Sequence, residues 1–236
     1  MSRRYQNKLF CFSPPVMIAT CVTELLLLVY TLWRYHLNQL TRIVAALLTL
    51  LAIFQLAEFQ VCTGSSYLAQ WSHLGYVAIT LLPPLGIHAI CTIAGKKRSP
   101  VVYAAYTTGA AFIAYFALSA GSLNGHQCLG NYVIFQVNHS LTWLYAVYYF
   151  GWVLLGMFMS LYFSKHAKEE RQRQALYYFT FGYVAFLLPT TTMNLLARST
   201  VHAIPSILCG FAVLLALVVV LLVMPKAGKL RIKESQ

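Results

Sequence analysis

The fold class is decided by the stretch Ile207-Leu-Cys-Gly-Phe-Ala-Val-Leu-Leu-Ala-Leu-Val-Val-Val-Leu-Leu-Val-Met224, which contains no charged residue. A helix needs about 20 mostly apolar residues to cross the hydrocarbon layer of a membrane. Every backbone amide and carbonyl must be paired internally there, which restricts a crossing segment to a helix or a closed barrel. The stretch shows no alternation with a period of two, so it predicts a transmembrane helix.

The composition of the rest of the chain agrees with this interpretation. Of 236 residues, 59% are apolar and 9% are charged, and the mean hydropathy is +0.66. Soluble domains carry about 25% charged residues, so this chain could not cover a globule with a polar surface. Disorder is excluded because it requires low hydrophobicity.

Six further apolar runs have the length of a membrane span, and we find no repeat or shift in composition between them. The sequence therefore predicts an all-α, polytopic integral membrane protein, with one seven-helix transmembrane domain over residues 1–236. The predicted spans are about 14–33, 41–62, 72–95, 101–121, 142–164, 174–197 and 204–224.

The distribution of Lys and Arg predicts the orientation. Thirteen of the 17 basic residues fall on one side, in the segments 34–42, 96–100 and 165–173 and in the tail after residue 224. Cytoplasmic loops carry the excess of positive charge, so the N-terminus is expected outside and the C-terminus in the cytoplasm. Arg3, Arg4 and Lys8 oppose this orientation for the first helix alone. We interpret the net charge of +12 as a topology signal that also attracts anionic lipid, and expect no nucleic-acid partner.

Two glutamates inside the predicted spans are the main candidates for a functional site. Glu24 lies near the middle of the first span, and Glu58 in the outer third of the second, on the same helix face as Gln55 and Cys62. An ionisable residue at such a depth costs about 2.5–3.5 kcal/mol on insertion scales and usually faces the bundle interior. The two carboxyl groups are either protonated, bound to a ligand cation or in reach of water. The alternative is that they are neutral and join helices by hydrogen bonds.

Two proline-containing segments add further candidates. His88 follows Pro83-Pro84, a pair that removes two backbone donors and frees carbonyls inside the third span. Pro189 precedes Thr190–Thr192 and Asn194 in the sixth. We expect Asn194, and His88 with it, to join the glutamates in an outward-opening polar pocket. The alternatives are a hydrogen-bonded interior histidine, and threonines that only satisfy carbonyls freed by Pro189.

The positions of the cysteines predict at most one disulfide bond. Cys62 ends the second span on the outside and Cys128 lies in the long outside loop, where an oxidising medium permits a disulfide. Two free thiols, or pairing with Cys11, are the alternatives. The spacings match no zinc site, and no nucleotide-binding or metalloprotease motif is present. We therefore expect no metal, no cofactor and no enzymatic activity.

Four segments resemble the seven-transmembrane N-terminal sensor region of some bacterial histidine kinases. They are Trp71-Ser-His-Leu-Gly-Tyr76 with Leu81-Leu-Pro-Pro-Leu-Gly-Ile-His88, then Arg171-Gln-Arg-Gln-Ala-Leu-Tyr-Tyr178, and Ala203-Ile-Pro-Ser206. The resemblance covers nearly the whole chain and implies an outside N-terminus. In that family the seventh helix leads into a cytoplasmic output domain, which this sequence lacks after Pro225.

The sequence as a whole therefore predicts a stand-alone sensory or receptor-like module in a membrane, expected to be the bacterial cytoplasmic membrane. It would bind a small or lipophilic ligand through Glu24, Glu58, His88 and Asn194 and signal to a partner protein. The alternatives are a small secondary transporter, with the third and sixth helices beside a midplane site, and a structural subunit of a membrane complex.

Overall fold

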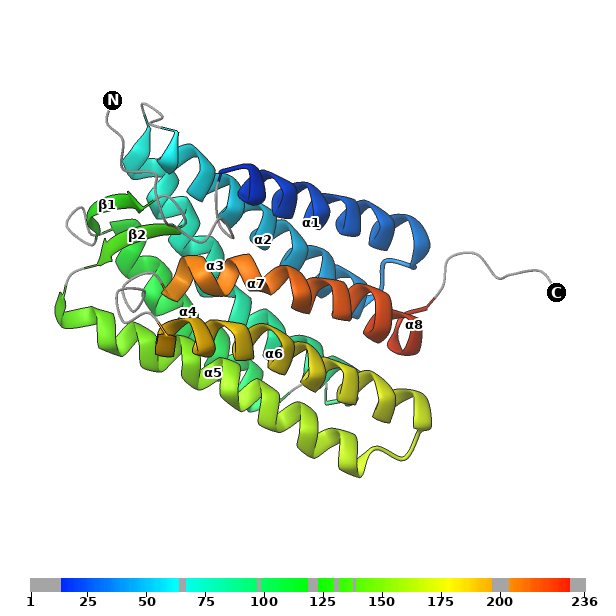
Figure 1. Cartoon of the computed structure of the whole chain (residues 1–236). Helices are drawn as coiled ribbons and strands as arrows, with labels where there is room; N and C mark the ends of the chain where they lie inside the picture. Colours follow the sequence, from blue (N-terminus) through cyan, green and yellow to red (C-terminus); the bar gives the residue numbers. More distant parts are fainter. Residues whose placement is uncertain are drawn as a thin grey trace.

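The structure is a computed structural model that describes residues 14–63, 67–96, 99–118, 123–129, 132–137, 139–196 and 204–229. Seven long helices run side by side in alternating directions, and a short hairpin lies at one end of the bundle (Figure 1). The elements are α1 Pro14–Arg34, α2 Gln39–Cys62, α3 Leu68–Ile93, α4 Pro100–Leu118, β1 Leu123–Leu129, β2 Tyr132–Val137, α5 His139–His166, α6 Glu170–Leu196, α7 Ile204–Val218, the π-helix η3 Val219–Val223 and α8 Met224–Ala227.

Each of the seven predicted ranges coincides with a helix, which confirms the helical part of the expected fold. The difference lies in the long loop before α5, where β1 and β2 form an antiparallel hairpin. The bundle is therefore all-α as expected, and this hairpin is an addition that the sequence analysis did not predict. Tyr132–Val137 is rich in β-branched and aromatic residues, and Gly130-Asn131 is a pair typical of two-residue hairpin turns.

The outward surface of the bundle is largely apolar. By length and composition, four of the described helices, α1, α2, α3 and α5, can cross a membrane. Large apolar side chains are also exposed along α6, α7 and η3, among them Leu188, Leu214 and Leu221. Exposed apolar area of this extent is foreign to a soluble monomer, so the surface is suited to contact with lipid.

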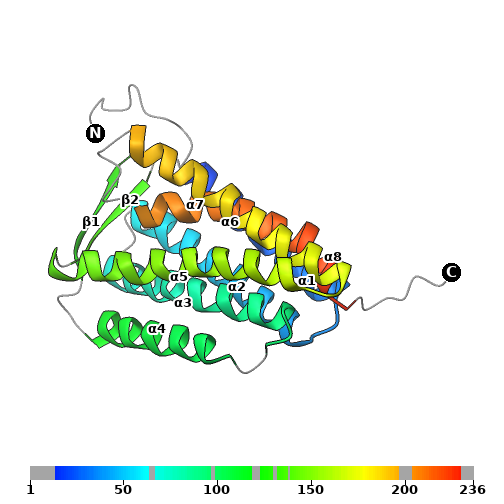
Figure 2. The ribbon, with the colours of Figure 1, turned by 90° about the horizontal axis from the view of Figure 1, so that it is seen from below.

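The α2 helix lies at the centre of one half of the bundle, between α1 and α3 (Figure 2). The α1 helix buries only one stripe, because Met17, Cys21, Glu24, Leu27 and Thr31 recur every three or four residues while the positions between them are mostly exposed. This pattern makes α1 a peripheral helix that packs on α2 and α7.

The double proline of α3 is accommodated without ending the helix. Pro84 has no amide hydrogen to bond the carbonyl of Thr80, four residues earlier. The hydroxyl of Tyr148, on α5, donates to this carbonyl over 2.7 Å. The Tyr145 hydroxyl lies 3.0 Å from the Thr80 hydroxyl oxygen. The carbonyl freed by Pro84 is thus used to join α3 to α5 rather than to line a site.

Candidate functional site

The site centres on Glu24, whose carboxyl group is enclosed between α1 and α2. Glu24 is 0% exposed, and neither of its carboxyl oxygens has a hydrogen-bond partner among the described residues. One turn earlier, the Cys21 thiol donates to the carbonyl of Ala52 on α2 over 3.6 Å. This contact shows that the buried stripe of α1, which carries Glu24, faces α2.

Two residues of α2 complete the polar cluster. Gln55 and Glu58 are 2% and 1% exposed, and the side-chain nitrogen of Gln55 has no hydrogen-bond partner in the described part of the chain. Glu24 and Glu58 lie close enough for their charges to interact. The two glutamates predicted from the sequence are therefore brought to one place, with Gln55 between Glu58 and the middle of the helix. We call these three residues the Glu24 cluster.

The Glu24 cluster contains buried polar atoms without hydrogen-bond partners among the described residues. A buried polar group that lacks a partner costs about 1–3 kcal/mol, and more if it is charged. No Lys or Arg lies within the central part of any predicted span to balance the two carboxyl groups. A small ligand that offers hydrogen-bond donors or a positive charge would satisfy Glu24, and an acceptor on the same ligand would satisfy Gln55.

The cluster lies toward the end of the bundle that carries the hairpin. Glu58 is one turn from the end of α2 at Cys62, and both β1 and β2 contact α2. The hairpin also contacts α3 and α7, so it lies across the helix ends near the cluster (Figure 1).

His88 does not belong to this site, contrary to the expectation from the sequence. Its Nε2 accepts a hydrogen bond from the Gln39 amide over 2.9 Å, and its Nδ1 lies 3.1 Å from the Tyr106 hydroxyl. Gln39 is the first residue of α2 and Glu58 the twentieth, which separates the two levels by about 28 Å at 1.5 Å per residue. Position in the sequence alone does not show that His88 lies at the opposite end of the bundle.

Two of the three threonines after Pro189, Thr191 and Thr192, bond to their own helix, and the side chain of Thr190 lies outside the described residues. The Thr191 hydroxyl donates to the carbonyls of Leu187 and Leu188, and the Thr192 hydroxyl to that of Leu188. Both side chains are exposed, so they line no shared pocket with Glu24. The side chain of Asn194 lies outside the described residues, and its place in the site stays a prediction.

One of the predicted disulfide residues is oxidised. Cys62 is disulfide-bonded, whereas Cys21 and Cys91 are free thiols. Cys128 belongs to β1, a strand that contacts α2. The pairing of Cys62 with Cys128 remains a prediction, because the side chain of Cys128 lies outside the described residues.

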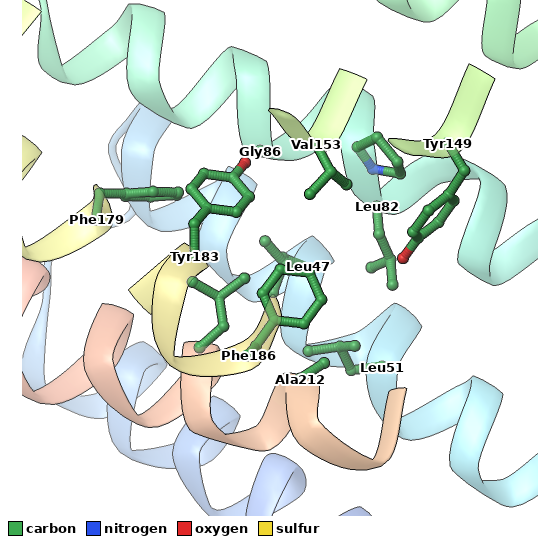
Figure 3. A pocket seen from close by; sticks show the side chains of 12 residues that line it. Leu47, Leu51, Leu82, Gly86, Tyr149, Val153, Phe179, Tyr183, Phe186 and Ala212 are labelled. Carbon is green, nitrogen blue, oxygen red and sulfur yellow. The ribbon is translucent and has the colours of Figure 1, made fainter. Parts of the chain in front are cut away.

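A second interior feature, which the sequence did not indicate, surrounds Tyr183 of α6. Its hydroxyl lies against Gly86 of α3 and Gly156 of α5, where an added Cβ would be 2.5 Å and 2.8 Å from the oxygen. The cavity beside it measures about 30 Å³ and is lined mainly by apolar side chains such as Leu47 and Phe186 (Figure 3). This volume is the share of a single water molecule, so the cavity is too small for an organic ligand.

Comparisons with known proteins do not narrow the chemistry: no family model matches the chain, and no curated protein or solved structure is detectably similar to it.

Proposed function

We propose that the chain is a sensory or receptor-like membrane module in which the Glu24 cluster binds a small ligand. The observation that carries this proposal is the Glu24 carboxyl group, which is fully buried with both oxygens unpartnered among the described residues. A group in this state is satisfied by a ligand that donates hydrogen bonds or carries positive charge, and small amines and inorganic cations are the simplest of these.

The module would cross the membrane seven times, with the N-terminus outside and the C-terminus in the cytoplasm of a bacterial cell. Apolar side chains exposed on α6 and α7 as well as on α1 and α5 support seven crossings. The excess of Lys and Arg at the end opposite the hairpin supports the orientation. The Glu24 cluster would then open toward the outside, beneath the hairpin.

A route from the site to the cytoplasmic end runs through α1. This helix is held mainly by α2 and α7, so a ligand between α1 and α2 would shift its position. At the far end of α1, the amide of His36 donates to the carbonyl of Lys229 over 2.9 Å. The turn between α1 and α2 thereby contacts the C-terminal segment. A partner protein bound there would respond to the change in the position of α1.

A transporter is less well supported. The two proline-containing helices, α3 and α6, meet at Gly86 and Tyr183, but both remain continuous helices. The cavity between them has room for about one water molecule. A solute passage at the position that this alternative requires would need more room than this cavity has.

The binding proposal is tested by thermal stability of the purified chain against a panel of small amines and inorganic cations. The variants are Glu24→Gln, which keeps the shape of the side chain, and Glu169→Gln, which removes an exposed carboxylate outside the helices. At least one compound should raise the melting temperature of the wild type and of Glu169→Gln, but not of Glu24→Gln. The same compound should change hydrogen exchange at residues 34–39.

Equal shifts for both variants, or no shift for any compound, would contradict ligand binding at Glu24 and favour a packing role in a structural subunit. A shift in melting temperature without any change in exchange at residues 34–39 would support binding but contradict the signalling route.

A further inference from the structure

A hollow between the end of α5 and the start of α6 combines positive charge with apolar surface. Its volume is about 330 Å³, and its lining includes Leu161, Lys165, Arg173, Gln174 and Tyr177. It lies on α5 and α6 at the end of the bundle opposite the hairpin, whereas the Glu24 cluster lies on α1 and α2. It is therefore a separate site, and the proposed sensory function makes no use of it.

On the polar side of the hollow, the carboxylate of Glu170 contacts two of the lining residues. The side-chain nitrogen of Gln174 donates to Oε1 of Glu170 over 2.8 Å, and the guanidinium group of Arg173 pairs with Oε2. An arginine has five N–H donors, so Arg173 keeps donors for a ligand while paired. Lys165 has no ion-pair partner within the part of the chain that the structure describes.

The charge around the hollow favours an anion. The segment 165–173 carries four basic residues, Lys165, Lys168, Arg171 and Arg173, and two acidic residues, Glu169 and Glu170. Two positive charges therefore remain unbalanced, and the two lining cations, Lys165 and Arg173, lie at the hollow itself. Two neighbouring cations that keep N–H donors for a ligand are typical of phosphate recognition.

The surface that continues from the hollow is apolar. Phe158, Tyr162 and Phe181 are exposed on α5 and α6, within two or three turns of the lining residues. A ligand that fills the hollow and extends along this surface therefore has an anionic group at one end and a hydrocarbon chain at the other. A soluble phosphate would contact the cations of the hollow but not the apolar surface.

We propose that the hollow binds the phosphate headgroup of an anionic phospholipid, with Lys165 and Arg173 on the phosphate and the acyl chains along Phe158, Tyr162 and Phe181. If the bundle crosses a bilayer, the end of α5 lies at headgroup depth, where such a lipid is available. Basic residues near the membrane surface each contribute about 1 kcal/mol to binding of anionic lipid. Loss of both lining cations should thus weaken binding roughly thirtyfold.

The experiment measures lipid binding to the purified full chain in detergent by native mass spectrometry, with phosphatidylglycerol and phosphatidylcholine of identical acyl chains. The test variant carries Lys165→Gln and Arg173→Gln. The matched control carries Lys168→Gln and Arg171→Gln, which removes the same charge from exposed positions that do not line the hollow. Wild type and control should prefer phosphatidylglycerol, and the test variant should lose this preference. Lys165→Gln alone leaves the Arg173–Glu170 pair intact, and it should lower the affinity for phosphatidylglycerol about fivefold.

Equal loss in the test and control variants would overturn the proposal, because it would show a response to overall charge. Equal binding of both lipids to the wild type would overturn it as well. A third arm uses soluble glycerol 3-phosphate: binding as tight as that of phosphatidylglycerol would replace the lipid with a free phosphate ligand. None of these outcomes depends on Glu24, so the site at α1 and α2 is judged separately.

Discussion

At the scale of single residues, the interior of the bundle is joined by tyrosine hydroxyls that meet backbone. Tyr148 donates to the carbonyl of Thr80, and Tyr183 lies between Gly86 and Gly156. Each contact fixes α5 or α6 against α3 at one point. The Glu24 cluster differs from them because both carboxyl oxygens of Glu24 and the side-chain nitrogen of Gln55 are buried without a hydrogen-bond partner among the described residues, which is why we assign it to a ligand.

Tyr148→Phe should destabilise the bundle by about 1–3 kcal/mol, because it leaves the Thr80 carbonyl buried without a donor. The free energy of unfolding can be measured by titration with denaturing detergent. In a Pro84→Ala background, the new backbone amide can bond Thr80, so the same substitution should cost less. An equal cost in both backgrounds would contradict the role assigned to this hydrogen bond.

Gly86→Ala should lower the melting temperature, since its Cβ would lie 2.5 Å from the Tyr183 hydroxyl oxygen. The next atom of Tyr183 is 3.7 Å away, so Tyr183→Phe in the same chain should restore stability. Gly151→Ala serves as the control, because no atom lies within 4 Å of its added Cβ. That change should be neutral or stabilising by up to about 1 kcal/mol. Failure of Tyr183→Phe to rescue Gly86→Ala would show that the hydroxyl is not the obstacle.

At the scale of elements, the exposed side of α1 distinguishes a membrane helix from a surface helix of a soluble protein. Leu26 lies near its middle and is 65% exposed. Leu26→Arg should therefore cost about 3 kcal/mol of apparent insertion free energy, measured with a glycosylation reporter, whereas Leu26→Ala should cost much less. An arginine that is tolerated as well as alanine would mean that this face of α1 meets water.

The hairpin is the other element with a testable connection to the bundle. We predict that digestion without reduction yields a peptide in which Cys62 is linked to Cys128. Loss of this link by Cys62→Ser should cost up to about 4 kcal/mol, because the bond closes a long loop. Cys128→Ser should lower the free energy of unfolding by the same amount, and the double variant should be no less stable than either single variant. Cys91→Ser changes a free thiol and should leave the disulfide intact. A link from Cys62 to Cys11 or Cys209 would contradict the predicted pairing.

At the scale of the whole molecule, the two ends of the bundle should face different compartments. Tyr67 is 65% exposed at the start of α3, and Lys168 is exposed in the connection between α5 and α6 at the other end. Tyr67→Cys should react with a membrane-impermeant maleimide in intact cells, and Lys168→Cys only after permeabilisation. The unsubstituted chain controls for the native thiols. Labelling of both positions in intact cells would contradict the proposed orientation.

Much of this architecture follows from the sequence because its signals are local and strong. Long apolar runs predicted all seven helices, since hydrocarbon allows few other backbone structures. Glu24 and Glu58 were recognisable as ionisable residues in such runs. Both side chains turn toward the bundle interior because contact of a carboxyl group with the hydrocarbon outside would cost free energy. The hairpin was missed because its strand signal is short and lies in a loop that composition alone leaves undefined.

The tertiary structure decided which of these residues meet. It brought Gln55 and Glu58 of α2 to Glu24, and it assigned His88 to Gln39 and Tyr106 at the far end of the bundle. It also formed the hollow at Lys165 and Arg173, which no sequence motif marks. The physical reason is that hydropathy fixes whether a segment is a helix in lipid, whereas the partners of a side chain depend on helix rotation, depth and neighbours. These are set by packing between segments that lie far apart in the chain.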